Sequence, residues 1–149
     1  MLSQLIIAVI VTIASTEIIH NYKDCGSRDG TVKSISISPC PQEPCYLKRG
    51  TNVSVTIEFT SNVATTHVTT SVHGILGFIP IPFTGIPSDA CTHHNVDHCP
   101  FVVGDQITYT NAIYVDPIYP LVRVAVKFEI KDDQHRDLVC FQFPTEIIN

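Results

Sequence analysis

The chain has 149 residues, which is enough for one domain with a single core. Its formal net charge of −5 is mild, and it argues against nucleic acid or an anionic membrane as the main partner. Charged residues make up 15% of the chain, whereas an average soluble domain has about 25%. The low fraction of charged residues indicates that more of the protein surface than usual is in contact with apolar groups. The wall of an internal cavity would be one such surface.

The first 16 residues are predicted to be a cleaved secretory signal peptide. An apolar run from Leu5 to Ala14 is followed by the small residues Ser15 and Thr16, and the run is too short to span a bilayer. The alternative is an N-terminal anchor, because no lysine or arginine precedes the run. We therefore expect a mature domain over residues 17–149, secreted or held in the lumen of the endosome or lysosome.

Six cysteines in a secreted chain indicate a disulfide framework, for which roughly 15 pairings are possible. They are Cys25, Cys40, Cys45, Cys91, Cys99 and Cys140. The second and third enclose a short proline-containing loop, and the fourth and fifth enclose another. If these two pairs close locally, the first cysteine must meet the last. The Asn52-Val53-Ser54 sequon marks Asn52 as a candidate glycosylation site, consistent with the secretory route.

Six segments are predicted to be β-strands, most of them from the alternation of apolar and polar residues and one from its many β-branched residues. They are residues 32–38, 52–60, 64–74, 107–113, 121–130 and 138–147. In the clearest one, Val53, Val55, Ile57 and Phe59 point one way, and Asn52 lies on the wet face. No stretch shows a helical period with a cap and a stop. About seven short strands therefore predict a single all-β domain, an immunoglobulin-like sandwich.

The segment 121–130 is expected to turn Arg123, Lys127 and Glu129 outward. Asp132 and Asp133 follow it and could form a catalytic carboxylate pair, but the polar stretch KDDQHRD favours turn residues. The chain has no G-x-S-x-G, zinc-protease or phosphate-loop motif and no lone cysteine nucleophile. We therefore expect no enzymatic activity and no catalytic residues.

The stretch from His73 to Cys91 is mostly apolar, has no charged residue before Asp89, and contains three prolines. Proline is confined to the edges, ends and bulges of sheets, and a surface loop would instead be polar. This combination predicts an edge-like backbone at the rim of a hydrophobic opening. The interior behind the rim would then admit a lipid.

The loop between the fourth and fifth cysteines is the best candidate for a metal site, since it contains His93, His94, Asp97 and His98. Its flanking cysteines are expected to be oxidised and so unable to act as thiolate ligands. A solvated loop is the simpler interpretation, and we expect no metal. His73 at the rim could sense acidic pH, although a hydrogen-bonded structural histidine is the simpler interpretation there too.

Several blocks extend over the whole mature chain in a recognisable order. They are DCGSRDG, SPCPQEPCYLKRG, FTSN, VHGILGFIPIPF, the DAC…CP pair, IYPLVRVAVKFEIKDD and VCFQFP. These blocks and the order of the cysteines resemble the ML lipid-recognition family, in its Niemann-Pick type C2 branch of sterol-transfer proteins. The resemblance implies a seven-stranded sandwich with a sterol-sized tunnel between the sheets. It also implies the disulfides Cys25–Cys140, Cys40–Cys45 and Cys91–Cys99.

The resemblance further implies roles for single residues. Phe83, in the PxPF motif, would contact the sterol, as would Val115 and Tyr119. The apolar lining would comprise Leu47, Val55, Ile81, Val124, Phe128 and Phe141. The transfer rim would comprise His73, Gly74, Ile75, Leu76, Gly77, Phe78, Ile79 and Pro80. Phe128 and Phe141 replace tryptophans of the vertebrate members, so the chain looks like an arthropod-type paralogue.

We therefore expect a monomeric carrier that holds a sterol and delivers it to a membrane surface or to a membrane sterol transporter. One alternative is a carrier of fatty acids or hydrophobic semiochemicals. Another is an innate-immune protein that recognises microbial lipids. That role calls for a cavity ringed by lysine and arginine, whereas the predicted rim is almost uncharged.

Overall fold

The computed structural model describes residues 3–11 and 17–149. These residues form nine strands and no helix, as the alternating patterns predict. The strands are β1 (Lys23–Asp24), β2 (Gly30–Ser38), β3 (Cys45–Lys48), β4 (Asn52–Ser61), β5 (Thr69–Leu76), β6 (Ile79–Pro82), β7 (Gln106–Tyr114), β8 (Arg123–Lys131) and β9 (Asp137–Ile148). Within the described ranges, no helix has the length and apolar character required to cross a membrane.

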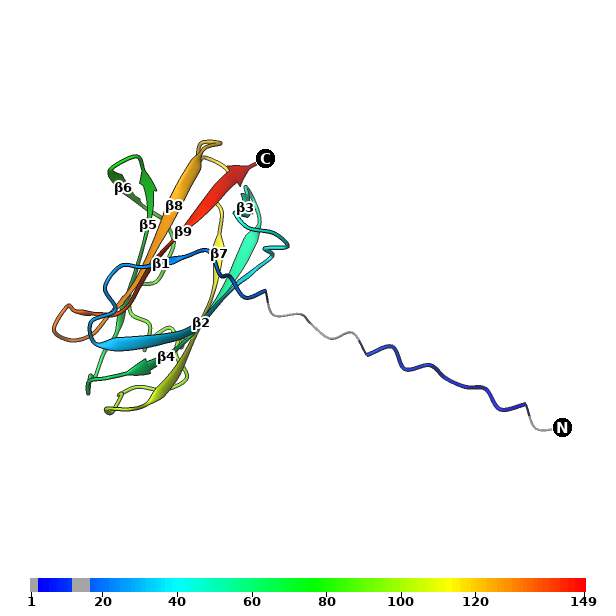
Figure 1. Ribbon diagram of the computed structural model, residues 1–149, viewed down its shortest axis with the longest axis horizontal. Coiled ribbons are helices and arrows are strands. Elements are labelled where there is room, and N and C mark those ends of the chain that lie inside the picture. Colours follow the sequence, from blue (N-terminus) through cyan, green and yellow to red (C-terminus); the bar gives the residue numbers. More distant parts are fainter. Residues whose placement is uncertain (1–2, 12–16) are drawn as a thin grey trace.

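The strands form two facing sheets (Figure 1). One has the order β1-β9-β8-β5-β6, with β3 pairing in parallel to β9, and the other has the order β2-β4-β7. The six long strands correspond to the six segments predicted from the sequence. The three short strands, β1, β3 and β6, have only two to four residues each, too few to show a period. They raise the total from the expected seven to nine.

Alternation along the strands fills the space between the sheets. Val53, Val55, Ile57 and Phe59 of β4 are all at most 4% exposed, and Asn52 is exposed. Because successive side chains of a strand point to opposite faces, the inner faces of both sheets are apolar and form one core. The immunoglobulin-like sandwich predicted from the sequence is confirmed.

The chain joins the domain at Glu17. The Ile37 amide donates to the Glu17 carbonyl, and the Ile19 amide donates to the Ile35 carbonyl, so this segment covers the edge of β2. Residues 3–11 are exposed and extend away from the sandwich (Figure 1). The cleavage position expected at residues 14–16 lies outside the described residues.

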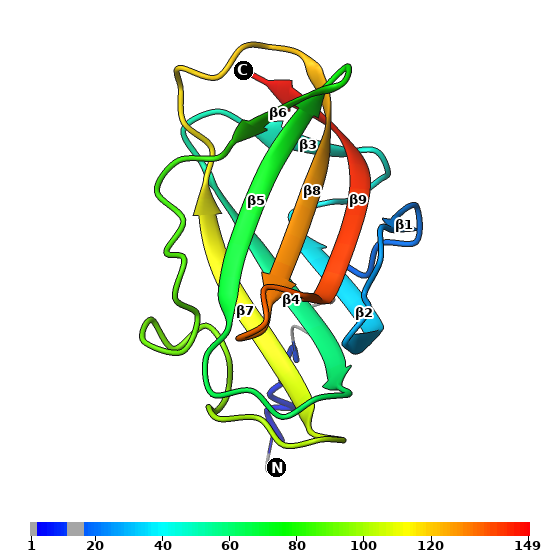
Figure 2. The same cartoon turned by 90° about the vertical axis from the view of Figure 1, so that its left-hand side faces the viewer.

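One end of the sandwich is tightly closed. Gly30 at the start of β2 lies against β9, where an added Cβ would come within 2.1 Å of the Leu138 carbonyl oxygen. The Asp29 amide donates to the Asp137 carbonyl, and the Asn62 amide donates to the Asp29 carbonyl. The β5–β6 hairpin and the β7–β8 connection lie together at the opposite end (Figure 2). Backbone hydrogen bonds therefore join the sheets at the Gly30 end. At the opposite end the β3–β4 turn joins them, since the Arg49 amide donates to the Ile148 carbonyl and the Gly50 amide donates to the Val115 carbonyl.

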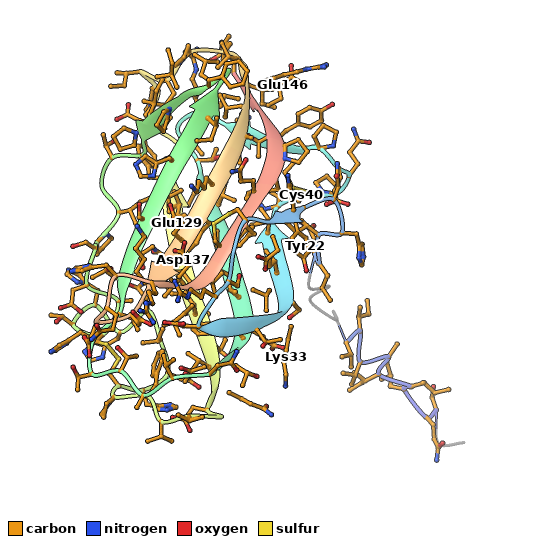
Figure 3. All side chains as sticks on the ribbon, turned by 60° about the vertical axis from the view of Figure 1, so that its left-hand side comes forward. Tyr22, Lys33, Cys40, Glu129, Asp137 and Glu146 are labelled. Carbon is orange, nitrogen blue, oxygen red and sulfur yellow. A yellow bond between two sulfur atoms is a disulfide. The ribbon has the colours of Figure 1, made fainter. Side chains whose placement is uncertain are left out.

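Glu129 points to the outer face of its sheet, as the alternation predicts, but it is only 8% exposed. One of its carboxylate oxygens lies within 4.8 Å of an Asp137 oxygen and the Cys140 sulfur, and Figure 3 shows the two acidic side chains on neighbouring strands. The ammonium groups of Lys127 and Lys131 lie 3.7 and 3.6 Å from the Glu129 carboxylate. Burial, together with the neighbouring Glu129 carboxylate, raises the pKa of Asp137 to about 7.

Candidate functional site

The proline-rich rim forms the β5–β6 hairpin at the open end of the sandwich. Gly77 has φ +65° and is the first of the two turn residues, the position that favours glycine in a type II′ hairpin. The prolines of β6 pair with β5 at the outer edge of the sheet, so their missing amides interrupt no central ladder. The predicted edge-like backbone is therefore an edge strand.

Phe83 follows β6 and turns inward beneath the hairpin. Its amide donates to the Val72 carbonyl at 3.0 Å, which fixes the start of the side chain. Gly74 lies opposite, and a Cβ there would approach the Phe83 ring to 3.4 Å. The Phe83 ring therefore packs directly over Gly74, where an added methyl group would lie at ordinary van der Waals distance.

Tyr119, on the β7–β8 connection, closes the opening from the other side. Its ring meets the Phe83 ring edge to face, with centroids 5.3 Å apart and an interplanar angle of 79°. The Thr84 amide donates to the Tyr119 hydroxyl at 3.0 Å, and the Arg49 guanidinium donates to the Tyr119 carbonyl at 3.2 Å. These contacts hold the two rings together as a closed aromatic pair.

Two apolar cavities lie on either side of this pair. The outer cavity, of about 50 Å³, is lined by Gly74, Leu76, Ile81, Pro82, Phe83, Tyr119, Pro120, Val122, Val124 and Ile147. The inner cavity, of about 30 Å³, is lined by Ile37, Leu47, Val53, Val55, Val72, Phe83, Ile113, Val115, Val126, Phe128 and Phe143. Phe83 belongs to both linings, so its ring separates the space under the rim from the space between the sheets.

The structure brings together most of the residues expected to contact a ligand. Eight of the nine line one of the two cavities, namely Phe83, Tyr119, Ile81, Val124, Leu47, Val55, Val115 and Phe128. Phe141 lines neither. It lies beside Phe128 on the neighbouring strand, and the two rings stack with centroids 5.5 Å apart. For the inner cavity, the sequence reasoning missed Ile37, Val53, Val72, Ile113, Val126 and Phe143. Their signal was present as inward positions of the predicted strands.

The cavities are small. Sites for drug-sized ligands usually measure about 300–1,000 Å³, several times more than 30 and 50 Å³ together. In place of a continuous tunnel, the structure therefore has two chambers divided by Phe83. A sterol could enter only if the Phe83 ring moved aside and the sheets parted. The side chains that line the inner cavity are all apolar, so this movement would break no hydrogen bond of theirs.

The surface around the opening is strongly apolar. Phe78 at the hairpin tip is fully exposed, and Ile79 and Ile118 are 66% and 80% exposed. These residues, together with Leu121, lie on the hairpin and the β7–β8 connection at one end of the sandwich (Figure 2). Clustered exposed apolar residues mark surfaces that bind partners or membranes. The nearby His73 ring lies 3.3 Å from the Ser71 hydroxyl.

The cysteines form the disulfides Cys25–Cys140, Cys40–Cys45 and Cys91–Cys99. These are the pairs that the resemblance implies, and none of the six thiols remains free.

Two of the three histidine side chains in the loop closed by the third disulfide have partners within the protein. The His98 ring lies 3.0 Å from the Asp105 carboxylate, and the His93 ring lies 3.1 Å from the Asp89 carbonyl. His67, Asp89 and Cys91 come together as a possible ligand set, but the Cys91 sulfur is committed to its disulfide.

The sequence is similar to a known domain family and to several known proteins. Residues 20–147 match the ML domain. The chain is 39% identical over 126 residues to the NPC intracellular cholesterol transporter 2 of Bos taurus, covering 85% of this chain and 83% of that protein. It is 38% identical over 128 residues to the ecdysteroid-regulated 16 kDa protein of Manduca sexta, covering 85% and 87%.

A solved structure agrees with the fold. The Niemann-Pick type C2 protein of the Japanese carpenter ant superposes with a TM-score of 0.79 at 26% identity, covering 85% of this chain and 98% of that one. The domain match over residues 20–147, the identity to these relatives and the superposable solved structure lead to one conclusion: the chain belongs to the ML-domain family.

Proposed function

We propose that the protein binds a sterol between its two sheets and delivers it through the opening at Phe83 and Tyr119. The observation that carries the proposal is that Phe83 borders both apolar cavities and lies directly under the exposed rim. A ligand moving from the rim to the core must pass this ring. The relatives named as cholesterol transporters support the choice of a sterol.

The chemistry of the lining suits this ligand. A sterol has about 28 heavy atoms, and at roughly 0.3 kcal/mol per atom its binding would be worth about 8 kcal/mol, or micromolar affinity. Burial of apolar surface supplies this energy, and no bond needs to be made or broken. One hydroxyl of the ligand could remain at the opening, beside the hydroxyl groups of Tyr119 and Thr84.

Delivery would use the exposed rim. Phe78, Ile79 and Ile118 form an exposed apolar surface. No lysine or arginine lies between Gly74 and Phe83. The rim could therefore dock on a membrane or on the apolar mouth of a membrane protein. The same lack of cationic residues disfavours capture of microbial lipids with phosphate groups. The three disulfides and the exposed Asn52 sequon support passage through the secretory route and glycosylation of Asn52.

The identity of the ligand can be tested by native mass spectrometry of the protein secreted from eukaryotic cells, followed by extraction of the bound lipid. Recovery of sterol supports the proposal. Recovery of straight-chain acids alone would overturn the choice of sterol and favour the fatty-acid carrier.

Two phenylalanine variants separate binding from delivery. Phe83→Ala should weaken cholesterol binding about tenfold or more, because burial of one phenylalanine side chain is worth about 1.5–3 kcal/mol. Phe78→Ala removes the same group from the fully exposed hairpin tip, and it should keep the affinity while slowing cholesterol transfer to phosphatidylcholine vesicles. Equal cholesterol affinity of Phe83→Ala and the parent protein would refute the proposed entry route.

A further inference from the structure

Three polar side chains lie together inside the sandwich. They are Thr70 on β5 and Tyr109 and Asn111 on β7, and the Asn111 amide donates to the Tyr109 hydroxyl at 3.1 Å. Tyr109 is fully buried and Thr70 is 6% exposed. The Thr70 hydroxyl is buried without a hydrogen-bond partner. A buried hydroxyl left unpaired is unfavourable, and such exceptions are uncommon enough to require an explanation.

The polar group lies at the inner end of the inner cavity. Val72 lines that cavity, and Thr70 is the next inward residue of β5, about 7 Å farther from the rim at the usual rise of a strand. On β7 the same cavity is lined by Ile113, and the two polar residues of that strand follow at the next inward positions. The ring of Phe128, at the cavity wall, meets the Tyr109 ring edge to face at 5.4 Å. A ligand that advanced past Phe128 would therefore end against these polar groups.

The hydrogen-bonding capacity of the group is not used up within the protein. Burial raises the pKa of Tyr109, so its phenol remains neutral and keeps a proton to donate, although the neighbouring Thr70 and Asn111 side chains oppose the rise. The Tyr109 oxygen already accepts from Asn111. The Thr70 hydroxyl can both donate and accept. It lies close enough to the phenol to lower the pKa of Tyr109, but the distance and angles between the two groups are not those of a formed hydrogen bond. A single hydroxyl from outside could accept from Tyr109 and donate to Thr70.

The opening at the other end of the path is also polar, since the Thr84 side chain lies 3.1 Å from the Tyr119 hydroxyl. An apolar path with hydroxyl groups at each end fits a ligand that is polar at each end. Resting on the sterol-binding function proposed above, we infer that this protein selects sterols hydroxylated at the end of the aliphatic tail, with the tail hydroxyl bound by Thr70 and Tyr109 and the ring hydroxyl at the opening.

The inference can be tested by measuring the affinity of the full secreted protein for three radiolabelled sterols. These are cholesterol, 25-hydroxycholesterol with its extra hydroxyl on the tail, and 7-hydroxycholesterol with its extra hydroxyl on the rings. We expect the tail-hydroxylated sterol to bind about tenfold more tightly than cholesterol, as one or two net hydrogen bonds would give. The ring-hydroxylated sterol should bind no better than cholesterol, because its extra hydroxyl would lie against the apolar middle of the path.

Thr70→Val tests the assigned partner, since valine keeps the shape of threonine and removes the hydroxyl. The variant should lose the tenfold preference while binding cholesterol within about twofold of the parent protein. It should melt no lower than the parent, because an unpaired buried hydroxyl is removed. Tyr109→Phe should reduce the preference in the same way.

Equal affinity of the parent protein for cholesterol and 25-hydroxycholesterol would overturn the inference. A Thr70→Val variant that still prefers 25-hydroxycholesterol would also overturn it. So would a Thr70→Val variant whose affinities for cholesterol and 25-hydroxycholesterol fall equally, because Thr70 would then bind the ring hydroxyl that both sterols share. In each of these outcomes cholesterol still binds and the sterol-binding function stands. Absence of binding for all three sterols would instead refute the proposed function itself.

Discussion

Filling the inner cavity with one methyl group should stabilise the fold and impair ligand binding together. Val55 lines the cavity of about 30 Å³, is 4% exposed and lies on β4, the central strand of its sheet. Isoleucine keeps the β-branched shape that suits a strand and adds a single methylene group. Val55→Ile is therefore the smallest substitution that places atoms in this space.

The expected gain follows from the size of the cavity. At about 24 cal/mol per Å³, removing a cavity of 30 Å³ is worth about 0.7 kcal/mol, and burial of one methylene group adds about 0.8 kcal/mol. The free energy of unfolding should rise by about 1.5 kcal/mol if the fit is good. For a domain of this size, that corresponds to an increase in melting temperature of about 5 °C.

Val139→Ile is the matched control. Val139 is fully buried and lines neither cavity, so the same added methylene should overpack the core and cost about 1–3 kcal/mol. Urea unfolding of both variants measures the two opposite changes. Cholesterol affinity should fall about fivefold to tenfold in Val55→Ile and stay unchanged in Val139→Ile, provided that the latter is folded.

Two results would contradict this reasoning. A stabilised Val55→Ile protein with unchanged cholesterol affinity would mean that the ligand does not use the inner cavity. Destabilisation by Val55→Ile, equal to that of the control, would mean that the space cannot accept a methyl group.

Three further predictions concern stability. The pKa of Asp137 is raised from 3.8 to about 7 by burial and by Glu129, so the folded state binds this proton more tightly than the unfolded state. The resulting stabilisation is complete below about pH 4 and is lost as the pH rises through about 7, by about 1 kcal/mol once solvent screening is allowed for. Asp137→Asn should flatten this part of the urea-unfolding profile against pH, and an unchanged profile would contradict the assignment. Gly30→Ala should lower the unfolding free energy by about 3 kcal/mol or reduce the secreted yield, because its Cβ would collide with the Leu138 carbonyl at 2.1 Å; a stable Gly30→Ala protein would refute that contact. Replacing Cys25 and Cys140 by serine should cost about 4–5 kcal/mol, because the bond closes a loop with a sequence separation of 115. Replacing Cys40 and Cys45 by serine should lower the unfolding free energy about half as much, since these two cysteines are only 5 residues apart in the sequence. Equal losses of stability in the two double variants would refute the loop-length argument.

The fold could be predicted from alternation because this signal is local. In β4 the pattern of Val53, Val55, Ile57 and Phe59 gives both the strand and its buried face, and the structure confirms both. The short strands escaped prediction because a strand of two to four residues has too little period and is defined by its partner. In β6, Pro80 and Pro82 argue against a strand until the sheet edge is known.

The identity of the site residues could be predicted from the sequence, but their arrangement could not, because it depends on how distant segments pack together. The resemblance assigns Phe83 and Tyr119 to ligand contact, but their pairing at a centroid distance of 5.3 Å and the division into two chambers depend on packing and on hydrogen bonds from distant segments. Burial of the outward-facing Glu129 was likewise missed. Alternation gives the direction of a side chain, whereas burial depends on what covers that face.

The placement of the hydrogen bonds that join the sheets indicates how the interior could open. At the end near Gly30, the backbone groups of Asp29 bond both to Asp137 and to Asn62, and the close contact with Leu138 leaves no room for relative movement. At the end near Phe83, the lining of both cavities is aliphatic or aromatic, and the closing pair is held chiefly by Thr84 and Arg49. The β3–β4 turn joins the sheets at this end through the bonds from Gly50 to Val115 and from Arg49 to Ile148. If the sheets part beside this joint, the apolar side chains of the inner lining lose no hydrogen bond, and an inserted sterol would cover the exposed apolar surface again. The energetic cost of opening is therefore largely recovered when the ligand binds, which favours entry by hinged parting of the sheets over a permanently open tunnel.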